Sequence, residues 1–439
     1  MTHKRNNKHT YFKDTFNTTQ MSKLLSNYDL MNKVIAEGHD LGIIQLKSEG
    51  DTYDGRTIVV NGKPLLYFGN CSYLGLDTSD ELKQGIIETV LKYGSCFSSS
   101  RFNVELGLYE QLESLLEEIM GHPCLVSQTT TLGHQSVFPI LIQPDDLIIM
   151  DHQVHASVQN AVKMVAALGT KTMFIRHNNM EALEAQVIEA QGKFKNIWYL
   201  ADGIYSMYGD GAPIPEMKAL MDKYDNLYSY VDDAHGISWI GKNGRGYILD
   251  SGPLHPKMIF STSMAKGYGA GGGILVFPTQ EMKQTIRNLG SSLFFSGPVS
   301  TPVLGACIAS AKLHLNGEIE RRQQELYARM KFFREKATLY NIPIINKNFS
   351  PIFYIGFGSL EAASGITKDL QNSGYSVIVC TYPGVSYKHS GIRVAITTHL
   401  SFEDIDKFTQ ALAFLVSEYE AQGLIKRDKI KRAFKLDFV

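Results

Sequence analysis

The chain has 439 residues, of which 44% are hydrophobic and 20% charged, and its net charge is −1. This length leaves room for two globular domains, and the near-zero charge argues against nucleic acid or an anionic membrane as the main partner. Five scattered cysteines without a C-x-x-C pair indicate a reducing, cytoplasmic setting and no zinc site, and no apolar run is long enough to span a bilayer.

The first 66 residues have the pattern of an N-terminal arm rather than a domain. The initial twenty are basic but lack the apolar core of a signal peptide. Residues 23–39 have helical character, and residues 56–70 read as a β-hairpin with Asn61-Gly62 at its turn.

The middle of the chain alternates strand-like and helix-like segments. The predicted strands are 146–151, 171–177, 196–203, 228–235 and 257–263, and the predicted helices between them are 156–169, 180–191 and 214–225. Such alternation predicts an α/β fold with a mostly parallel sheet between helices, in a large domain over residues 67–305. Ligands bind such sheets at the carboxyl ends of the strands.

After about residue 300 the pattern changes to that of a smaller α+β domain, residues 306–439. We expect one long helical stretch over 301–340, strands at 350–357 and 375–380, and a final helix over 401–423 that opens with an S-x-x-D cap. The tail 424–438 is basic. A solvated helix face is favoured there over a contact with an anionic carrier or membrane, because two aspartates interrupt the charge.

Lys266 is surrounded by small residues in the stretch FSTSMAKGYGAGGGI (260–274). A lysine at a strand end in a low-dielectric site has a lowered pKa and can form a Schiff base, as in pyridoxal phosphate (PLP) enzymes. The glycines would let a cofactor approach closely. Taken alone, the stretch is equally compatible with a glycine-rich turn between strands.

Three further strand ends carry polar residues. In VDDAHG (231–236), Asp232 could hold the pyridine nitrogen of PLP protonated and His235 could contact the cofactor, although a capping aspartate and a core histidine would look the same. His155 begins a helix directly after a strand, where its ring could cover a planar cofactor. Asp202 and Ser206 lie in ADGIYS, at the end of another predicted strand. His155, Asp202 and Ser206 are each also compatible with a structural role in a turn or at a helix start.

The order and spacing of these elements resemble the α-oxoamine synthase family of fold-type-I PLP enzymes. The resemblance runs from NGKPLLYFGNCSYLGL through SSSRF, LYEQLE, HNNMEAL and FFSGP to GIRVAITTHLSFEDID. The family includes aminooxononanoate synthase, 2-amino-3-ketobutyrate ligase, aminolevulinate synthase and serine palmitoyltransferase. The HNNME and DGIYSMYGD stretches are most similar to the bacterial serine palmitoyltransferase type.

The resemblance implies a role for each matching residue. Lys266 would bind PLP and shuttle the α-proton, Asp232 would hold the pyridine nitrogen protonated, and His155 would stack on the cofactor ring. Further cofactor contacts would come from Ser206, His235, Thr130, Thr131 and Ser263, the last standing where the family usually has threonine near the phosphate. Arg393 in GIRVAI matches the arginine that holds the amino-acid carboxylate; without the resemblance it would read as an edge-strand arginine facing solvent.

The implied reaction is a decarboxylative condensation of an α-amino acid with an acyl thioester, giving an α-aminoketone. The acyl group would ride on coenzyme A or an acyl carrier protein. The family works as homodimers with the active site at the subunit interface, and Ser296 in FFSGP would supply the neighbouring chain's phosphate contact.

Three positions depart from the family pattern. Cys71 stands where the family has an asparagine near the substrate, and Asn70 comes one residue earlier. The usual S/T-G-F/Y cofactor loop reads TTT (129–131) in this chain. Tyr109 stands where the family has a histidine. These changes predict a reshaped acyl-substrate pocket rather than an inactive enzyme.

Two other functions remain open on sequence alone. One is an aminotransferase or another PLP reaction on the same fold, since fold alone does not fix chemistry. The other is a cofactor-free binding or regulatory protein, motivated by the TTT loop and Cys71. Serine, glycine and alanine are all plausible amino acids by family, and the pathway, lipid or biotin-type, is open.

Overall fold

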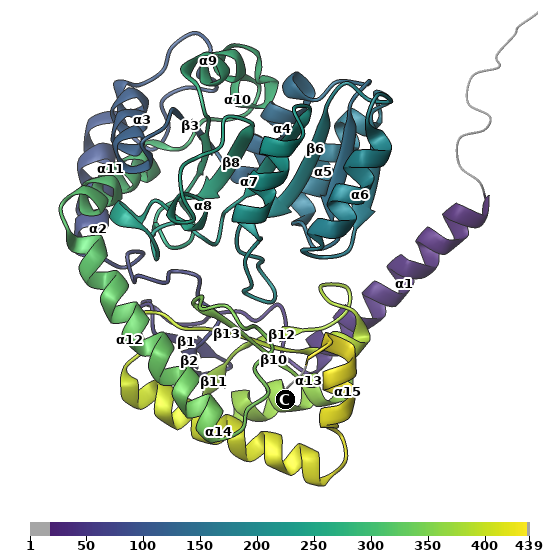
Figure 1. Ribbon diagram of the computed structural model, residues 1–439. Coiled ribbons are helices and arrows are strands. Elements are labelled where there is room, and N and C mark those ends of the chain that lie inside the picture. Colours follow the sequence, from purple (N-terminus) through teal and green to yellow (C-terminus); the bar gives the residue numbers. More distant parts are fainter. Residues whose placement is uncertain (1–17, 437–439) are drawn as a thin grey trace, which may run out of the picture.

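The computed structural model describes residues 18–436 and is built around a seven-stranded sheet (Figure 1). The strand order is β3-β9-β8-β7-β6-β4-β5, and every strand runs parallel to the others except β9. The strands are β3 (Cys124–Ser127), β4 (Leu147–Asp151), β5 (Lys171–Ile175), β6 (Ile197–Asp202), β7 (Leu227–Asp232), β8 (Met258–Ser263) and β9 (Gly273–Val276). The prediction of an α/β fold with a mostly parallel sheet is confirmed.

Helices cover both faces of this sheet. One apolar core lies under α3 (Gly107–Met120), α6 (Met180–Ala190), α7 (Ile214–Lys223), α8 (Tyr247–Asp250) and α11 (Thr301–Leu315). The other lies under α4 (Thr130–Leu141), α5 (Ala156–Ala166), α9 (Gln280–Leu289) and α10 (Ser291–Phe294). Because β4 and β6 are buried on both faces, their sequences are continuous apolar runs.

Two small sheets lie below the large one in Figure 1. The first has the order β1-β2-β11 and joins the predicted hairpin, β1 (Thr57–Val60) and β2 (Lys63–Tyr67), to β11 (Tyr375–Ser376). Asn61 and Gly62 both have positive φ, as a tight hairpin turn requires. The second is antiparallel and has the order β10 (Ile352–Gly356), β13 (Gly391–Ala395), β12 (Ile378–Cys380).

The structure differs from the sequence interpretation in two places. The expected single helical stretch over 301–340 is two helices, α11 and α12 (Glu318–Leu339), because Gly317 adopts a left-handed φ of 89° between them. The expected strand 375–380 divides into β11 and β12, which belong to different sheets. The predicted cap of α14 (Phe402–Ala421) is confirmed as a capping box between Ser401 and Asp404.

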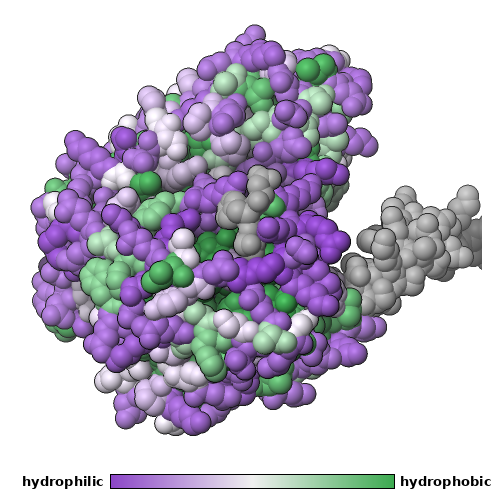
Figure 2. All heavy atoms as spheres, turned by 60° about the horizontal axis from the view of Figure 1, so that its bottom comes forward, coloured by the Kyte–Doolittle hydropathy of each residue, from purple (hydrophilic) through white to green (hydrophobic). Residues whose placement is uncertain are grey.

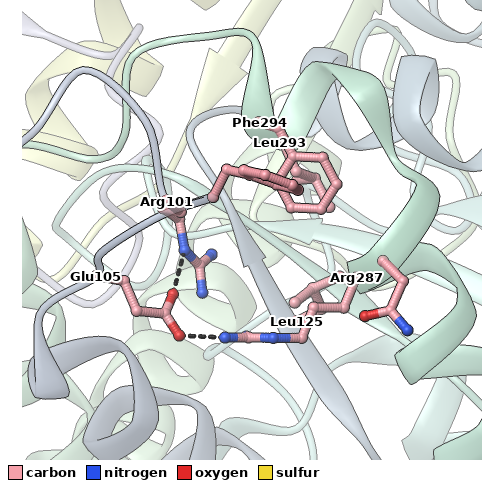
Figure 3. Close-up of a pocket in the computed structure, with 8 residues that line it drawn as sticks. Arg101, Glu105, Leu125, Arg287, Leu293 and Phe294 are labelled. Carbon is pink, nitrogen blue, oxygen red and sulfur yellow. Dashed lines mark hydrogen bonds and ion pairs between the residues drawn. The ribbon is translucent and has the colours of Figure 1, made fainter.

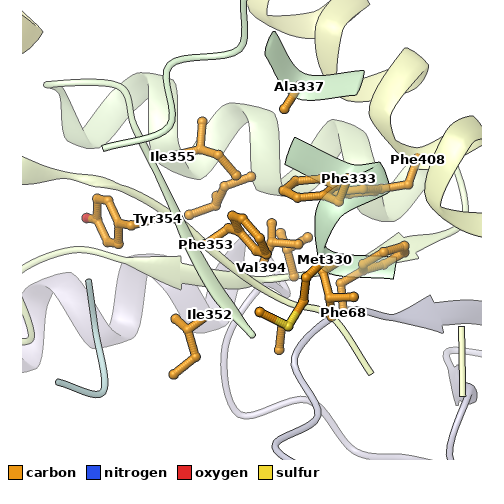
Figure 4. Close-up of a cluster of buried hydrophobic side chains, with 14 of the residues drawn as sticks. Phe68, Met330, Phe333, Ala337, Ile352, Phe353, Tyr354, Ile355, Val394 and Phe408 are labelled. Carbon is orange, nitrogen blue, oxygen red and sulfur yellow. The ribbon is translucent and has the colours of Figure 1, made fainter. Parts of the chain in front are cut away.

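The small sheets share a core with α12, α13 (Leu360–Asn372) and α14. Aromatic rings interlock there: Phe68 stacks on Phe408 at 4.0 Å between ring centroids, and Phe333 meets Phe353 edge-on at 4.7 Å (Figure 4). Strands from both the first and the last third of the chain therefore depend on one core. The division of the chain at residues 66 and 305 stays a prediction.

The remaining helices are α1 (Thr18–Asp40), α2 (Asp80–Tyr93) and α15 (Arg427–Phe434). α1 extends away from the body and only its C-terminal end meets the small sheets (Figure 1). The face around those sheets is mostly hydrophilic, with hydrophobic residues in separate patches (Figure 2). Within the described residues, no helix combines the length and apolarity that a membrane span needs.

Candidate active site

Four neighbouring strands deliver polar side chains to one edge of the large sheet. β4 ends at Asp151, β6 at Asp202, β7 at Asp232 and β8 at Ser263, and Asp202 and Asp232 are direct register partners. All of these side chains are buried. Because buried carboxylates are costly, their concentration at a strand-end edge is typical of a functional site.

Lys266 follows β8 in a tight turn at this edge. Its carbonyl accepts a hydrogen bond from the Gly269 amide at 2.9 Å, and a Cβ on Gly267 would lie only 2.6 Å from the Ile237 carbonyl oxygen. Burial lowers the pKa of Lys266, while the nearby Asp232 carboxylate opposes that shift. The small residues around Lys266 are thus required by close backbone packing, and they leave an amine that loses its proton more readily than usual.

Asp232 ends a buried chain of polar groups. The Nε2 atom of His134 lies 3.2 Å from an Asp232 carboxylate oxygen, and its Nδ1 atom is hydrogen-bonded to the Tyr230 hydroxyl at 2.7 Å. Although burial alone would raise the pKa of Asp232, His134 and then Lys266 bring it down to about 2. Asp232 is therefore ionised at neutral pH. Sequence reasoning missed His134, which lies inside the apolar helix α4.

His155 is the N-cap of α5 and also contacts the strand edge. Its backbone N–H donates to the Asp202 carboxylate at 2.9 Å, and its Nδ1 atom accepts from the Ser157 amide at 3.2 Å. Burial lowers the pKa of His155, so the ring is neutral near pH 7. Burial, reinforced by Asp232, raises the pKa of Asp202 well above its ordinary value. Two carboxylates side by side thus differ in charge: Asp232 is ionised and Asp202 tends to keep its proton.

His235 lies on the turn after β7 and is fully enclosed. The Tyr73 hydroxyl is hydrogen-bonded to its Nδ1 atom at 2.8 Å, and its carbonyl accepts from the Trp239 indole at 2.7 Å. Burial, followed by repulsion from Lys266, pushes the pKa of His235 well below its usual range. The ring is therefore a neutral hydrogen-bonding group, held by Tyr73, which sequence reasoning did not single out.

The TTT loop forms the N-terminus of α4. Thr129 is the N-cap and its hydroxyl accepts from the Leu132 amide at 3.1 Å, so Thr130 and Thr131 form the first turn. A Cβ on Gly273 would lie 2.6 Å from the Thr130 nitrogen. Backbone amides at a helix N-terminus attract phosphate. Ser263, near the start of the Lys266 turn, is buried and its hydroxyl accepts from the Ala265 amide at 3.2 Å.

Arg393 reaches the same region from the small antiparallel sheet. It lies on β13, the central strand, and is only 5% exposed, so the interpretation as a solvent-facing edge residue is wrong. One guanidinium nitrogen donates to the Ser206 carbonyl at 2.9 Å and the other to the Cys71 sulfur at 3.3 Å. Its Nε atom is buried without a hydrogen-bond partner. This unsatisfied donor is suited to an incoming carboxylate.

Three remaining candidates lie farther out. The Asn70 amide donates to the Tyr53 hydroxyl at 2.8 Å, in a cluster with Asp77. The Tyr109 ring lies under the Arg101 guanidinium and its hydroxyl donates to the Val299 carbonyl at 3.3 Å. Ser296 lines a narrow cavity that also contains Ser127 and Gln128, next to the TTT loop.

The residues at this edge fit PLP. An amine with a lowered pKa, an ionised buried carboxylate and a helix N-terminus match the aldehyde, the pyridine nitrogen and the phosphate of the cofactor in chemical type. The partnerless Nε atom of Arg393 adds an anion contact for a substrate.

A second charged cluster supports the loop that carries Ser206. The two ring nitrogens of His177 contact Asp151 at 3.0 Å and Asp210 at 2.6 Å, and the His177 ring meets Tyr205 edge-on. Burial alone would lower the pKa of His177, but the two carboxylates raise it to about 9. A doubly paired histidinium thus ties β4 to the loop 203–212. Sequence reasoning used HNNME only as a point of resemblance.

His177 gives the first prediction, on pH dependence. Because its pKa rises from 6.5 to about 9 on folding, its contribution to stability is complete below pH 6.5 and is lost as pH rises through about 9. We expect the unfolding free-energy difference between the wild type and His177→Gln to shrink by up to about 3 kcal/mol over this range. Chemical denaturation at pH 6 to 10, with the exposed His152→Gln as control, measures it. A difference that does not change with pH would contradict the pairing.

Comparison with known proteins agrees with this geometry. Residues 69–412 match the family "Aminotransferase class I and II". The 8-amino-7-oxononanoate synthase of Alkaliphilus metalliredigens is 30% identical over 353 residues, covering 80% of this chain and 87% of that protein. The chain belongs to the α-oxoamine synthases.

Two more relatives extend the comparison. The serine palmitoyltransferase of Bacteriovorax stolpii is 27% identical over 362 residues, covering 82% of this chain and 84% of that protein. The solved serine palmitoyltransferase of S. paucimobilis, which has a PLP–myriocin aldimine bound, superposes with a TM-score of 0.82 at 20% identity, over 92% of this chain and all of that one. The last likeness shows the fold-type-I architecture. PLP is the cofactor of the family, and its reaction is the decarboxylative condensation of an amino acid with an acyl thioester.

Proposed function

We propose that the site at the strand ends condenses a small α-amino acid with an acyl thioester, with Lys266 as the group that holds PLP and moves the α-proton. The observation that carries this assignment is the placement of the half-buried Lys266, whose pKa is lowered, within electrostatic reach of the ionised carboxylate of Asp232. PLP, when bound, acts as the electron sink for the α-carbon.

The neighbouring residues have separate roles in this proposal. Asp232, held ionised by His134, stabilises the protonated pyridine nitrogen, and the neutral ring of His155 covers the cofactor plane. His235 and Ser206 contribute hydrogen bonds. The amides of Thr130 and Thr131, with Ser263, face the phosphate. The Lys266 amine removes the α-proton, because its lowered pKa makes the neutral, basic form more accessible.

Arg393 is proposed to hold the carboxylate of the amino acid, and Cys71 to line the same pocket. Arg393→Lys keeps the charge but loses the planar fork, so we expect the KM for the amino acid to rise about 10- to 100-fold with a smaller change in the KM for the thioester. Steady-state kinetics with each substrate varied in turn tests this. Equal effects on both KM values would contradict a specific carboxylate contact.

The experiment for the function as a whole is product identification. PLP-loaded protein is incubated with serine, glycine or alanine and with acyl thioesters on coenzyme A or an acyl carrier protein. We expect release of the free thiol of the carrier and an α-aminoketone whose mass equals the sum of the amino acid and the free carboxylic acid of the acyl group, less carbon dioxide and water. Formation of a keto acid from the amino acid, without use of the thioester, would instead favour an aminotransferase.

The protein is further proposed to act as a homodimer, with Ser296 directed to the partner's phosphate site. Apolar side chains are exposed around a cavity of about 320 Å³ lined by Phe102 and Phe294 (Figure 3). They are Phe102, which lines the cavity, Leu289 and Phe295, which directly follow lining residues, and Phe97 and Val104, which line the adjoining cavity; Phe295 is 89% exposed. Glu105 pairs with both arginines of this cavity, Arg101 and Arg287. Because these charges are paired, the exposed aromatic rim of the cavity is the part suited to contact with another chain.

Sedimentation analysis tests this association. We expect the wild type to sediment as a dimer and Phe295→Asp to weaken the dimer at least about tenfold, because a charge would be buried in an apolar contact. Phe414→Asp, an equally polar change on the exposed side of α14, is the control and should leave the dimer intact. A monomeric wild type would contradict the proposal.

Five unpaired cysteines support the further proposal of a cytoplasmic location.

A further inference from the structure

The C-terminal helix α15 folds back from the end of α14 onto the core of the small sheets (Figure 1). It lies beyond residues 69–412, the part of the chain that matches the family. Ile430 is completely buried, and Phe434, four residues later and therefore on the same face of the helix, packs against the same core. The Nε2 atom of His389 donates to the Ala433 carbonyl at 2.8 Å. α15 is thus docked through an apolar face and the hydrogen bond from His389.

The Phe434 ring lies against three rings from distant segments. Its centroid is 4.7 Å from that of His389, 5.9 Å from that of Tyr354 and 6.1 Å from that of Tyr208. These three residues also contact one another, since Tyr208 meets Tyr354 edge-on at 4.7 Å and the Tyr354 hydroxyl donates to the His389 carbonyl. Aromatic pairs at such separations stabilise a fold beyond their buried area. We call Phe434, His389, Tyr354 and Tyr208 the C-terminal cluster.

The three partners of α15 in this cluster all belong to segments that surround Arg393. Tyr354 on β10 is the register partner of Arg393 on β13, so the two side chains lie on the same face of the sheet. Tyr208 follows Ser206 by two residues, and the Ser206 carbonyl accepts a hydrogen bond from the Arg393 guanidinium at 2.9 Å. His389 lies two residues before β13 begins. The cluster thus joins the segments that set the position of Arg393.

The orientation of Arg393 depends on the groups packed around it. Its side chain is buried, and its Nε atom has no hydrogen-bond partner among the described residues. The Ser206 carbonyl that it contacts belongs to the loop 203–212, and Tyr208 ties that loop to the cluster. A shift of this loop would move the acceptor of the guanidinium. Misplacement of a binding group by about 1 Å can cost about 100-fold in rate.

We propose that α15 positions the Arg393 guanidinium for the carboxylate of the amino acid, and that Phe434 is the positioning residue. The inference rests on the proposed function for the role of Arg393. It goes beyond that function by assigning a task to a helix outside the matched family range. Because Phe434 acts through the other three rings of the cluster, its loss should weaken binding of the amino acid and leave binding of the thioester unaffected.

Titration of PLP-loaded protein with serine, glycine or alanine, followed by absorbance, measures the Kd of the amino acid without turnover. Phe434→Ala is expected to raise this Kd and the KM for the amino acid about tenfold, and the KM for the thioester less than about twofold. Tyr208→Leu, which removes a ring from the other side of the cluster, should give the same selective rise. Phe434→Leu keeps apolar volume and should recover most of the loss. Phe414→Ala removes an exposed ring from α14 and should bind as wild type.

A double-mutant cycle with Arg393→Lys tests whether the effect acts through Arg393. Because the two residues act as a unit in this proposal, Phe434→Ala should raise the Kd of the amino acid less than about twofold in the Arg393→Lys background. Effects that multiply independently would overturn the inference. An unchanged Kd in Phe434→Ala, or equal rises for the amino acid and the thioester, would overturn it as well while the wild type still forms product. A wild type that forms no thioester-dependent product would instead overturn the proposed function.

Discussion

Lys266→Ala is expected to lower kcat by about 10⁴-fold or more. The substitution removes both the amine that bonds the cofactor and the group proposed to move the α-proton, and general acid–base catalysis alone accounts for 10²- to 10⁴-fold in typical enzymes. Borohydride reduction of the wild-type protein followed by peptide mass spectrometry should locate the cofactor on Lys266. The variant should carry no covalent cofactor.

A matched control separates this effect from a general loss of lysine charge. Lys193→Ala removes an exposed lysine in the turn after α6 that forms an ion pair with Glu189 at the surface. It should keep full activity. If Lys266→Ala retained a covalently bound cofactor with normal absorbance, the assignment of the site would be wrong.

Asp232→Asn is expected to lower kcat by about 10²- to 10³-fold, the usual cost of removing a preorganised charge from an active site. The amide has nearly the same shape as the carboxylate but cannot carry the charge that His134 and Lys266 stabilise. Weaker retention of PLP during dialysis should accompany the loss. His134→Gln should give a smaller decrease, because it acts on the cofactor through Asp232.

The neighbouring residue offers an isosteric control. Burial, followed by repulsion from Asp232, raises the pKa of Asp233 to about 8, so Asp233 is mostly protonated at pH 7. Asp233→Asn therefore exchanges one neutral group for another of similar size. We expect it to change kcat less than about tenfold. Comparable losses in Asp232→Asn and Asp233→Asn would mean that shape rather than charge matters at this turn.

The fold of the large sheet could be predicted from sequence because its strands are buried on both faces. β4 and β6 are continuous apolar runs that end in an aspartate, and the helices between the strands keep a regular spacing. The polar residues at the ends of these strands also allowed the site to be predicted, because parallel strands end at one edge of the sheet. Family resemblance then supplied roles that no single motif could.

The features that were missed depend on contacts between distant segments. His134 has no local signal inside α4, and its partner Asp232 comes 98 residues later, in β7. The clamp of Asp210 on His177 likewise spans two strand ends. Arg393 could not be placed on a central strand, because the pairing of β13 with both β10 and β12 is set by tertiary structure. The break at Gly317 did have a signal, the Asn-Gly pair before α12.

The three departures from the family pattern lie in different parts of the structure. Cys71 contacts the Arg393 guanidinium, so its thiol lies beside the group proposed to hold the amino-acid carboxylate. The TTT loop caps α4 through Thr129 and keeps its amides at the helix N-terminus, without the usual aromatic wall. Tyr109 is buried under Arg101, beside the apolar rim proposed to form the dimer. None of them removes Lys266, Asp232 or His155 from the strand-end edge.

Release of labelled carbon dioxide tests the central claim most directly. PLP-loaded protein is given carboxyl-labelled serine, glycine or alanine, with and without a panel of acyl thioesters of different chain length and carrier. The account predicts release only when an amino acid and a thioester are both present, and none from Lys266→Ala. Release that is independent of every thioester, or no release in the presence of bound cofactor, would contradict it.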